Sequence, residues 1–146
     1  MAKWLRYIKF QDWIIRFINS SNRWKIILIA NSNINKNISW AYKFYPIPYN
    51  LIEIWDDYKF ILLSQLSDEA KQNDLLFFVS AGAAANIIIS NLIKINNKNI
   101  YIDFGSSIEF ITKGFSTRSY SKPNSVYAFQ SCESFELVNK TIFYDR

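Results

Sequence analysis

Two acidic residues, Asp103 and Glu109, could do chemistry together because they stand six positions apart around the turn sequence Gly105-Ser106-Ser107. A carboxylate at a strand end can hold a ribose hydroxyl, or a divalent cation that bridges a diphosphate. A second carboxylate nearby can share the metal or act as a general base. A structural interpretation is equally open, in which Asp103 caps the turn and Glu109 lies on the surface.

A second candidate is the sequence Ser80-Ala81-Gly82, which joins an apolar run to a helical one. Its small side chains would let a ligand approach the backbone. The N-terminus of the following helix offers unpaired N–H groups and the positive end of the helix dipole, which suit a phosphate. The single glycine matches neither of the glycine-rich phosphate motifs, and tight turns of this kind also occur without a ligand. Phosphate binding here therefore stays a hypothesis.

A cationic segment, Lys113–Tyr120, follows the two carboxylates and is rich in hydroxyl groups. Arg118 offers a planar donor fork for a phosphate or carboxylate, and Lys113 could add a point charge. Most loop arginines are simply solvated. The position of Arg118 after two carboxylates favours a functional role.

The elements that must position these residues form a strand–helix–strand unit. Leu75–Val79 is a continuous apolar run, typical of a strand buried on both faces of a parallel sheet. Ala83–Ile95 predicts a helix against that sheet, and Ile100–Phe104 predicts the next strand. Ligands bind at the carboxyl ends of strands in open parallel sheets, so Ser80–Gly82 and Asp103–Glu109 are expected at one rim.

The remaining chain supports one α/β domain. Trp4–Ile18 predicts a basic amphipathic helix, which could lie on a membrane surface; covering a sheet is the favoured interpretation. The sequence further predicts strands at Trp24–Ala30 and Lys43–Ile47, a short helix at Ile34–Tyr42, and a long helix from Leu51 to about Lys71 with Asn50 as its N-cap and Ile61 on its apolar face.

Strand and helix alternate at least three times, which predicts a single Rossmann-like domain with a mostly parallel sheet flanked by helices. We expect an N-terminal helix in residues 1–23, a core in 24–120, and an irregular or β tail in 121–146. Strands are possible in that tail at Val126–Gln130 and Thr141–Tyr144.

Composition narrows the function classes. The net charge of +5 is compatible with an anionic ligand, but the basic residues are scattered, which argues against nucleic-acid binding. The chain has no histidine, which removes His-based catalysis and the usual zinc sites. The single Cys132 excludes an internal disulfide and fits a reducing compartment, so we expect a cytoplasmic protein. No apolar run is long enough for a transmembrane segment.

The sequence from Phe77 to Tyr120 resembles the C-terminal half of glycosyltransferase domains with the GT-D fold, including a branch found in bacterial and viral surface-glycan genes. Members have a strand ending in Ser-Ala-Gly or similar, then a helix, an I-D-x-G-S strand end, an acidic residue and a T-R-x-Y segment. The matching positions are Ser80–Gly82, Ile102–Ser106, Glu109 and Thr117–Tyr120. The similarity extends upstream to about Trp24.

The resemblance implies transfer of a sugar from a nucleoside diphosphate donor, a nucleotide sugar, to a glycan acceptor. It implies that Asp103 and Glu109 hold a divalent metal, Mn²⁺ or Mg²⁺, and that they carry catalysis together with Arg118. Arg118 would stabilise the charge of the leaving nucleotide. The residues expected around the nucleotide are Ser80, Ala81, Gly82, Gly105, Ser106, Lys113 and Thr117.

Two departures from the family's pattern keep a second function open. The first acid of the family's Asp-x-Glu motif falls at Ser107, and the Arg-x-Gly-Asp-Gly-Glu segment that usually begins these domains is not found. The chain therefore looks like a shortened version that could need a partner chain to complete its site. The alternative is a non-catalytic nucleotide-binding, glycan-binding or structural module on the same fold.

Overall fold

The computed structural model describes residues 3–20, 23–34 and 37–113, with the backbone alone for residues 3–8. These residues fall into two compact units. The first, which we call the sheet unit, comprises residues 23–33 and 41–105. The second unit comprises the described residues of 1–22, 34–40 and 106–146. The division of the chain predicted at residues 23 and 120 stays a prediction.

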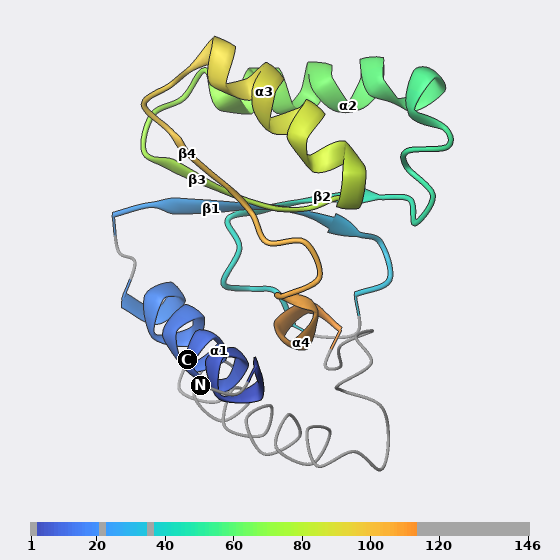
Figure 1. Cartoon of the computed structure of the whole chain (residues 1–146). Coiled ribbons are helices and arrows are strands. Elements are labelled where there is room, and N and C mark those ends of the chain that lie inside the picture. The colour runs from blue at the N-terminus through green and yellow to red at the C-terminus, as the bar shows by residue number, and fades with distance from the viewer. Residues whose placement is uncertain (1–2, 21–22, 35–36, 114–146) are drawn as a thin grey trace. The chain divides into compact units, whose positions relative to one another are not determined.

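The sheet unit contains four strands: β1 (Lys25–Asn31), β2 (Lys43–Ile47), β3 (Leu75–Ser80) and β4 (Ile100–Asp103). All neighbouring strands are parallel, and the order across the sheet is β2-β1-β3-β4 (Figure 1). Each of these four strands lies within one residue of its predicted bounds, whereas the possible strands at Val126–Gln130 and Thr141–Tyr144 lie outside the described residues. The prediction of an α/β fold with a parallel sheet and flanking helices is confirmed.

β1 and β3 lie at the centre of the sheet because both are apolar on both faces. Residues 26–30 of β1 are all buried, and residues 75–79 of β3 are fully buried. The edge strands β2 and β4 carry the exposed charged residues Lys43 and Asp103. This gradient from apolar centre to polar edge is expected when helices or other segments cover a parallel sheet.

Two helices cover one face of the sheet: α2 (Trp55–Ala70) and α3 (Ala85–Ile95), the latter preceded by the 3₁₀ turn η1 (Gly82–Ala84) (Figure 1). The crossovers β2–α2–β3 and β3–α3–β4 run in the same direction along the sheet. Right-handed crossovers therefore put both helices on the same face.

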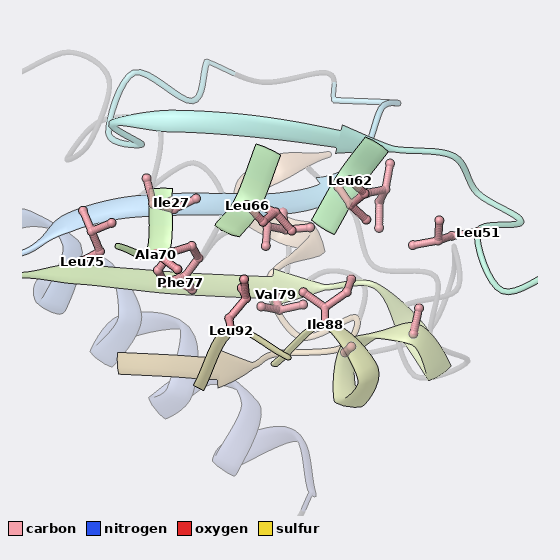
Figure 2. Close-up of a cluster of buried hydrophobic side chains, with 14 residues drawn as sticks. Ile27, Leu51, Leu62, Leu66, Ala70, Leu75, Phe77, Val79, Ile88 and Leu92 are labelled. Carbon is pink, nitrogen blue, oxygen red and sulfur yellow. The ribbon is translucent and has the colours of Figure 1, made fainter. Parts of the chain in front are cut away.

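The core of the sheet unit lies between these helices and that face (Figure 2). Burial of each large aliphatic or aromatic side chain stabilises the fold by about 1.5–3 kcal/mol. The core cluster consists of Ile27, Ile29, Ile47, Leu51, Leu62, Leu66, Ala70, Leu75, Phe77, Val79, Ala84, Ala85, Ile88 and Leu92.

Asn99 joins three elements at the amino end of the sheet. Its side-chain amide donates to the carbonyl oxygens of Ala70 (3.0 Å), the last residue of α2, and of Gln72 (2.9 Å), two residues later. Its Oδ1 accepts the N–H of Leu75 at the start of β3 (3.1 Å). Asn99 is buried, so these bonds satisfy backbone groups that water does not reach.

A buried carboxylate ties β2 to α2. Glu69 accepts a hydrogen bond from the ammonium of Lys43 and another from Nε2 of Gln72 (3.2 Å). Burial, together with a hydrogen bond to Glu69, raises the pKa of Tyr45 well above its ordinary value. Lys and Tyr from β2 therefore compensate a carboxylate that α2 places in the interior.

Three sequence predictions in this region were wrong. The segment Ile34–Tyr42 is not helical in its described residues, where Asn37 accepts the N–H of Ser39 (2.9 Å). Asparagine side chains compete with helical hydrogen bonding in this way. Asn50 does not cap α2: turns precede the helix, Ile54 stands at the N-cap, and Asn50 accepts through its backbone carbonyl. Ile61 is 60% exposed, because the face of α2 toward the sheet is centred on Leu62 and Leu66.

The second unit contains α1 (Lys3–Ser20) and the single-turn helix α4 (Glu109–Thr112). The predicted N-terminal helix is confirmed, and it extends one residue earlier and two later than predicted. Its Ile14, Ile15 and Ile18 are buried, while Trp13 is half exposed and stacks on Phe17 with ring centroids 5.4 Å apart. Among the described residues, no helix is long and apolar enough to cross a membrane.

Candidate functional site

The carboxyl ends of the strands meet at one edge of the sheet unit, which we call the rim. Ala30 of β1 is in register with Ser80 of β3, and Val79 is in register with Asp103 of β4. The sequence elements Ser80–Gly82 and Asp103–Gly105 therefore lie at the same edge, as the strand–helix–strand pattern predicted.

Hydrogen bonds fasten the end of β4 to the end of β3. The hydroxyl of Ser80 donates to the carbonyl oxygen of Gly105, and the N–H of Phe104 donates to the carbonyl of Val79 (2.8 Å). Oδ1 of Asp103 accepts the N–H of Gly105 (2.8 Å), whose φ of +51° suits glycine. Asp103 thus caps this turn, as its structural interpretation stated, while its side chain remains exposed.

The turn after β3 leaves the start of the helical segment open. Gly82 has φ +55°, and a Cβ built there would meet no atom within 4 Å, so its backbone conformation rather than crowding favours glycine. Neither η1 nor α3 begins with a side-chain cap. Gly82 and Ala83 are exposed, whereas Ala84 and Ala85 are buried against the core. The first N–H groups of a helix lack intrahelical partners, so this end can receive an anion.

The strand order adds Asn31, Ser32 and Asn33 to the site. The sequence predicted only a loop there. The chain moves from β1 to β2 in one direction and then to β3 on the other side of β1, so the order reverses between β1 and β3. Ligands of open α/β sheets bind at such a reversal.

The loop after β1 is ordered by its own polar groups. Asn31 accepts the N–H of Asn33 (2.9 Å), and the N–H of Ser32 donates to Ile47 (3.0 Å). This ties the end of β1 to the end of β2. Only the strand order could have shown that this loop neighbours Ser80–Gly82.

The rim is polar but carries little charge. Asp103 is the one residue charged at neutral pH in the strand-end segments 31–33, 47–50, 80–82 and 103–105. An anion at the rim would therefore be held by backbone N–H groups and by Asn and Ser side chains of the sheet unit.

The second unit contains Glu109 and Lys113, which form an ion pair. Nζ of Lys113 lies 3.0 Å from Oε1 of Glu109, one helical turn earlier, and the two side chains are only 13% and 10% exposed. Glu109 is thus buried. The alternative prediction from the sequence, that Glu109 is a surface residue, was wrong. Because the two charges compensate each other, Glu109 attracts a metal ion less strongly and Lys113 attracts a phosphate less strongly.

The other predicted site residues are located as follows. The backbone carbonyl of Ser106 accepts the N–H of Glu109 (3.2 Å) at the start of α4. Thr117 and Arg118 lie outside the described residues. Asp103 belongs to the sheet unit and Glu109 to the second unit, so their convergence stays a prediction.

The part of the chain that the structure describes contains no ready-made cluster of metal ligands. Among them, no three His, Cys, Asp or Glu side chains form a group that could hold a metal ion. Oε1 of Glu109 also accepts a hydrogen bond from the ammonium of Lys113 (3.0 Å), which competes with a metal ion for this oxygen. Metal binding by Asp103 and Glu109 stays a prediction, and the function proposed below does not depend on it.

Comparisons with protein-family models, with curated proteins and with solved structures found no match to this chain. The resemblance to GT-D glycosyltransferases accordingly stays a prediction.

Proposed function

We propose that the rim binds the diphosphate of a nucleotide sugar and that the chain acts as a glycosyltransferase domain on a glycan acceptor. One observation carries this proposal: the sheet order reverses between β1 and β3, beside a helix start that no side chain caps. An open parallel sheet concentrates ligand binding at that position.

In this proposal the backbone N–H groups of Gly82 and Ala83 receive a phosphate. These groups lie between β3 and α3, where the positive end of the α3 dipole favours an anion. The amide of Asn31 and the hydroxyl of Ser32 lie on the β1 side and can hydrogen-bond the sugar or the ribose. Asp103 is suited to a ribose hydroxyl through the carboxylate oxygen that does not cap Gly105.

The leaving nucleotide needs positive charge as the glycosidic bond to its phosphate breaks. The rim of the sheet unit supplies no cationic side chain, so Arg118 takes this role in the proposal. Transfer thus depends on Arg118, whereas binding of the diphosphate depends on the rim. The two functions can be separated by mutation.

The ion pair of Glu109 and Lys113 favours a second candidate, a non-catalytic module that binds a nucleotide or glycan without transferring a sugar. A carboxylate that holds a buried lysine is a poor base and a poor metal ligand. Asp103 is then the one carboxylate available for acid–base catalysis in the strand-end segments of the rim.

Calorimetric titration with UDP, GDP and dTDP, each with and without manganese, tests the proposal. The informative variant is Ala83→Asp, which puts a negative charge at the exposed start of the helical segment. That charge repels a phosphate but interacts favourably with the helix dipole, so the fold is preserved. Ala83→Asn is the matched neutral control.

We expect one nucleotide to bind, Ala83→Asp to abolish its binding, and Ala83→Asn to retain most of it. Sugar transfer from the corresponding donor, lost in Arg118→Ala while binding survives in weakened form, supports the enzyme. Binding without turnover of any donor supports the module. If no nucleotide binds the folded protein, the glycosyltransferase and the nucleotide-binding module are both wrong for the isolated chain.

A further inference from the structure

α2 exposes apolar side chains on the side that faces away from the sheet. Leu62 and Leu66 point into the core of the sheet unit (Figure 2). Phe60 and Ile61, by contrast, are 74% and 60% exposed. On a helix with 3.6 residues per turn, Phe60 lies nearly opposite Leu62. Helix geometry therefore fixes Phe60 on the outer side of α2, where its ring cannot reach the core.

Two aspartates lie next to these apolar residues. Asp56 and Asp57 stand one turn before Phe60 and Ile61, respectively, and residues four apart are neighbours on a helix surface. Both aspartates are exposed. We call the surface formed by Asp56, Asp57, Phe60 and Ile61 the outer face of α2. It combines apolar contact area with negative charge, although the whole chain has a net charge of +5.

A lysine of the same helix shows how this face receives a cation. Nζ of Lys59 lies 5.3 Å from the centroid of the Phe60 ring and is paired with the carboxylate of Asp56. An aromatic ring beside a carboxylate suits a lysine or arginine from another chain equally well. No ion pair of Asp57 is found in the described part of the chain. Asp57 can therefore receive a further cation.

The apolar residues distinguish this face from an ordinary acidic helix start. Asp56 and Asp57 also interact favourably with the dipole of α2, so they do not by themselves indicate a partner. The solvent side of a surface helix is usually polar, and exposing Phe60 and Ile61 there does not stabilise the sheet unit. The segment that leads into α2 also exposes Tyr49. These side chains are suited to burial against another molecule.

The charge of the outer face selects the kind of partner. Asp56 and Asp57 would repel the phosphates of a nucleic acid or of an anionic membrane. In a twofold dimer through this face, the aspartates of one copy would oppose those of the other. A basic protein segment has the complementary charge. An amphipathic helix also presents apolar side chains at the spacing needed to pack against another helix.

We infer that the outer face of α2 docks a basic amphipathic helix of a partner protein. Apolar side chains of that helix cover Phe60 and Ile61, and its lysines or arginines pair with Asp56 and Asp57. A single helix buries a small area, so the complex is weak and transient. The inference does not depend on the proposed function, because it uses no nucleotide and no residue of the rim.

Two synthetic helical peptides test this inference. One contains only leucine and lysine, and the other has glutamate in place of every lysine. Fluorescence anisotropy of each labelled peptide, titrated with the full chain, measures the two affinities. We expect the leucine–lysine peptide to bind more tightly. This comparison is informative because nonspecific attraction to a chain with a net charge of +5 would favour the acidic peptide.

Substitutions locate the binding. Phe60→Ser removes an apolar contact and Asp57→Lys reverses a charge, and each should weaken binding of the leucine–lysine peptide on the order of tenfold. Ile93→Ser, at an isoleucine 45% exposed on α3, is the matched control and should leave the affinity unchanged. Circular dichroism verifies that each variant is folded.

Tighter binding of the basic peptide, weakened in both α2 variants and not in the α3 control, supports the inference. Four results would overturn it: no binding of the basic peptide, equal or tighter binding of the acidic one, an affinity unchanged by the α2 substitutions, or an equal loss in Ile93→Ser.

Discussion

The hydroxyl of Ser80 donates a hydrogen bond to the carbonyl oxygen of Gly105, and this contact fastens the turn after β4 to the end of β3. It joins two segments of the rim that are 25 residues apart in the chain. The rim is therefore a preorganised edge of the sheet.

Ser80→Ala should lower the free energy of unfolding by about 1 kcal/mol, because the half-buried Gly105 carbonyl loses its donor. Urea unfolding measures the change. Ser90→Ala is the control: Ser90 is exposed on α3 and donates only to Ile87 in the preceding turn. Equal effects of the two substitutions would contradict a special role for Ser80.

Asn99→Leu should destabilise the sheet unit by about 3 kcal/mol, because the groups bonded to Asn99 lose their partners without access to water. Chemical denaturation of the variant gives this value. Asn97→Ala, an exposed change two residues earlier, should have little effect. If Asn99→Leu lowers the free energy of unfolding by no more than an ordinary surface substitution does, water takes the place of the Asn99 amide in the variant.

Alkaline pH should destabilise the protein through Tyr45, Tyr101 and Lys43. Burial raises the pKa of both tyrosines above 10.0, and the hydrogen bond to Glu69 raises the pKa of Lys43 above 10.5. The folded protein then keeps protons that the unfolded chain releases. Stability is therefore fully present below about pH 10 and decreases as pH rises through the folded-state values.

Tyr45→Phe should flatten this alkaline decrease, although the loss of the hydrogen bond to Glu69 lowers stability at neutral pH. Thermal unfolding at several pH values between neutrality and pH 11 measures both effects. Tyr49→Phe, at a tyrosine 88% exposed, should leave the profile unchanged. If stability falls with pH as steeply in Tyr45→Phe as in the unaltered protein, the pKa of the Tyr45 hydroxyl is not higher in the folded protein than in the unfolded chain.

The ion pair of Glu109 and Lys113 should show strong coupling. Lys113→Met should cost about 3 kcal/mol of stability, because it leaves a buried carboxylate without its cation. Glu109→Gln combined with Lys113→Met should cost less than the sum of the single changes. A double-mutant cycle measures the coupling; additive effects would indicate that the pair contributes nothing in solution.

The sequence predicted the strands and most helices because their patterns are local and strong. The short apolar runs of β1 and β3 are typical of buried strands, and Gly82 marked the break before α3. The helix expected at Ile34–Tyr42 is absent from its described residues, where the Asn37 side chain bonds the backbone of Ser39 and so competes with helical hydrogen bonding. Ile61 is exposed because the face of α2 that packs on the sheet is centred on Leu62 and Leu66, which the apolar sequence pattern alone did not distinguish from the Ile61 face.

The candidate site was predictable only in part. Ser80–Gly82 and Asp103 follow strands, so their placement at one edge required nothing beyond a parallel sheet. The contribution of Asn31–Asn33 depended on strand order, which short-range patterns do not encode. The pairing of Glu109 with Lys113 has the spacing of an ordinary helical ion pair, but its burial depends on how the chain packs around α4.

The most direct test of the central claim is an NMR titration of the assigned backbone amides with UDP, GDP and dTDP. If the rim holds the diphosphate, the amides of Gly82 and Ala83 should shift most, together with those of Asn31–Asn33 across the strand reversal. The amides around Asn99, at the opposite end of the sheet, should not move. Shifts confined to other segments, or none with any nucleotide, would contradict the account.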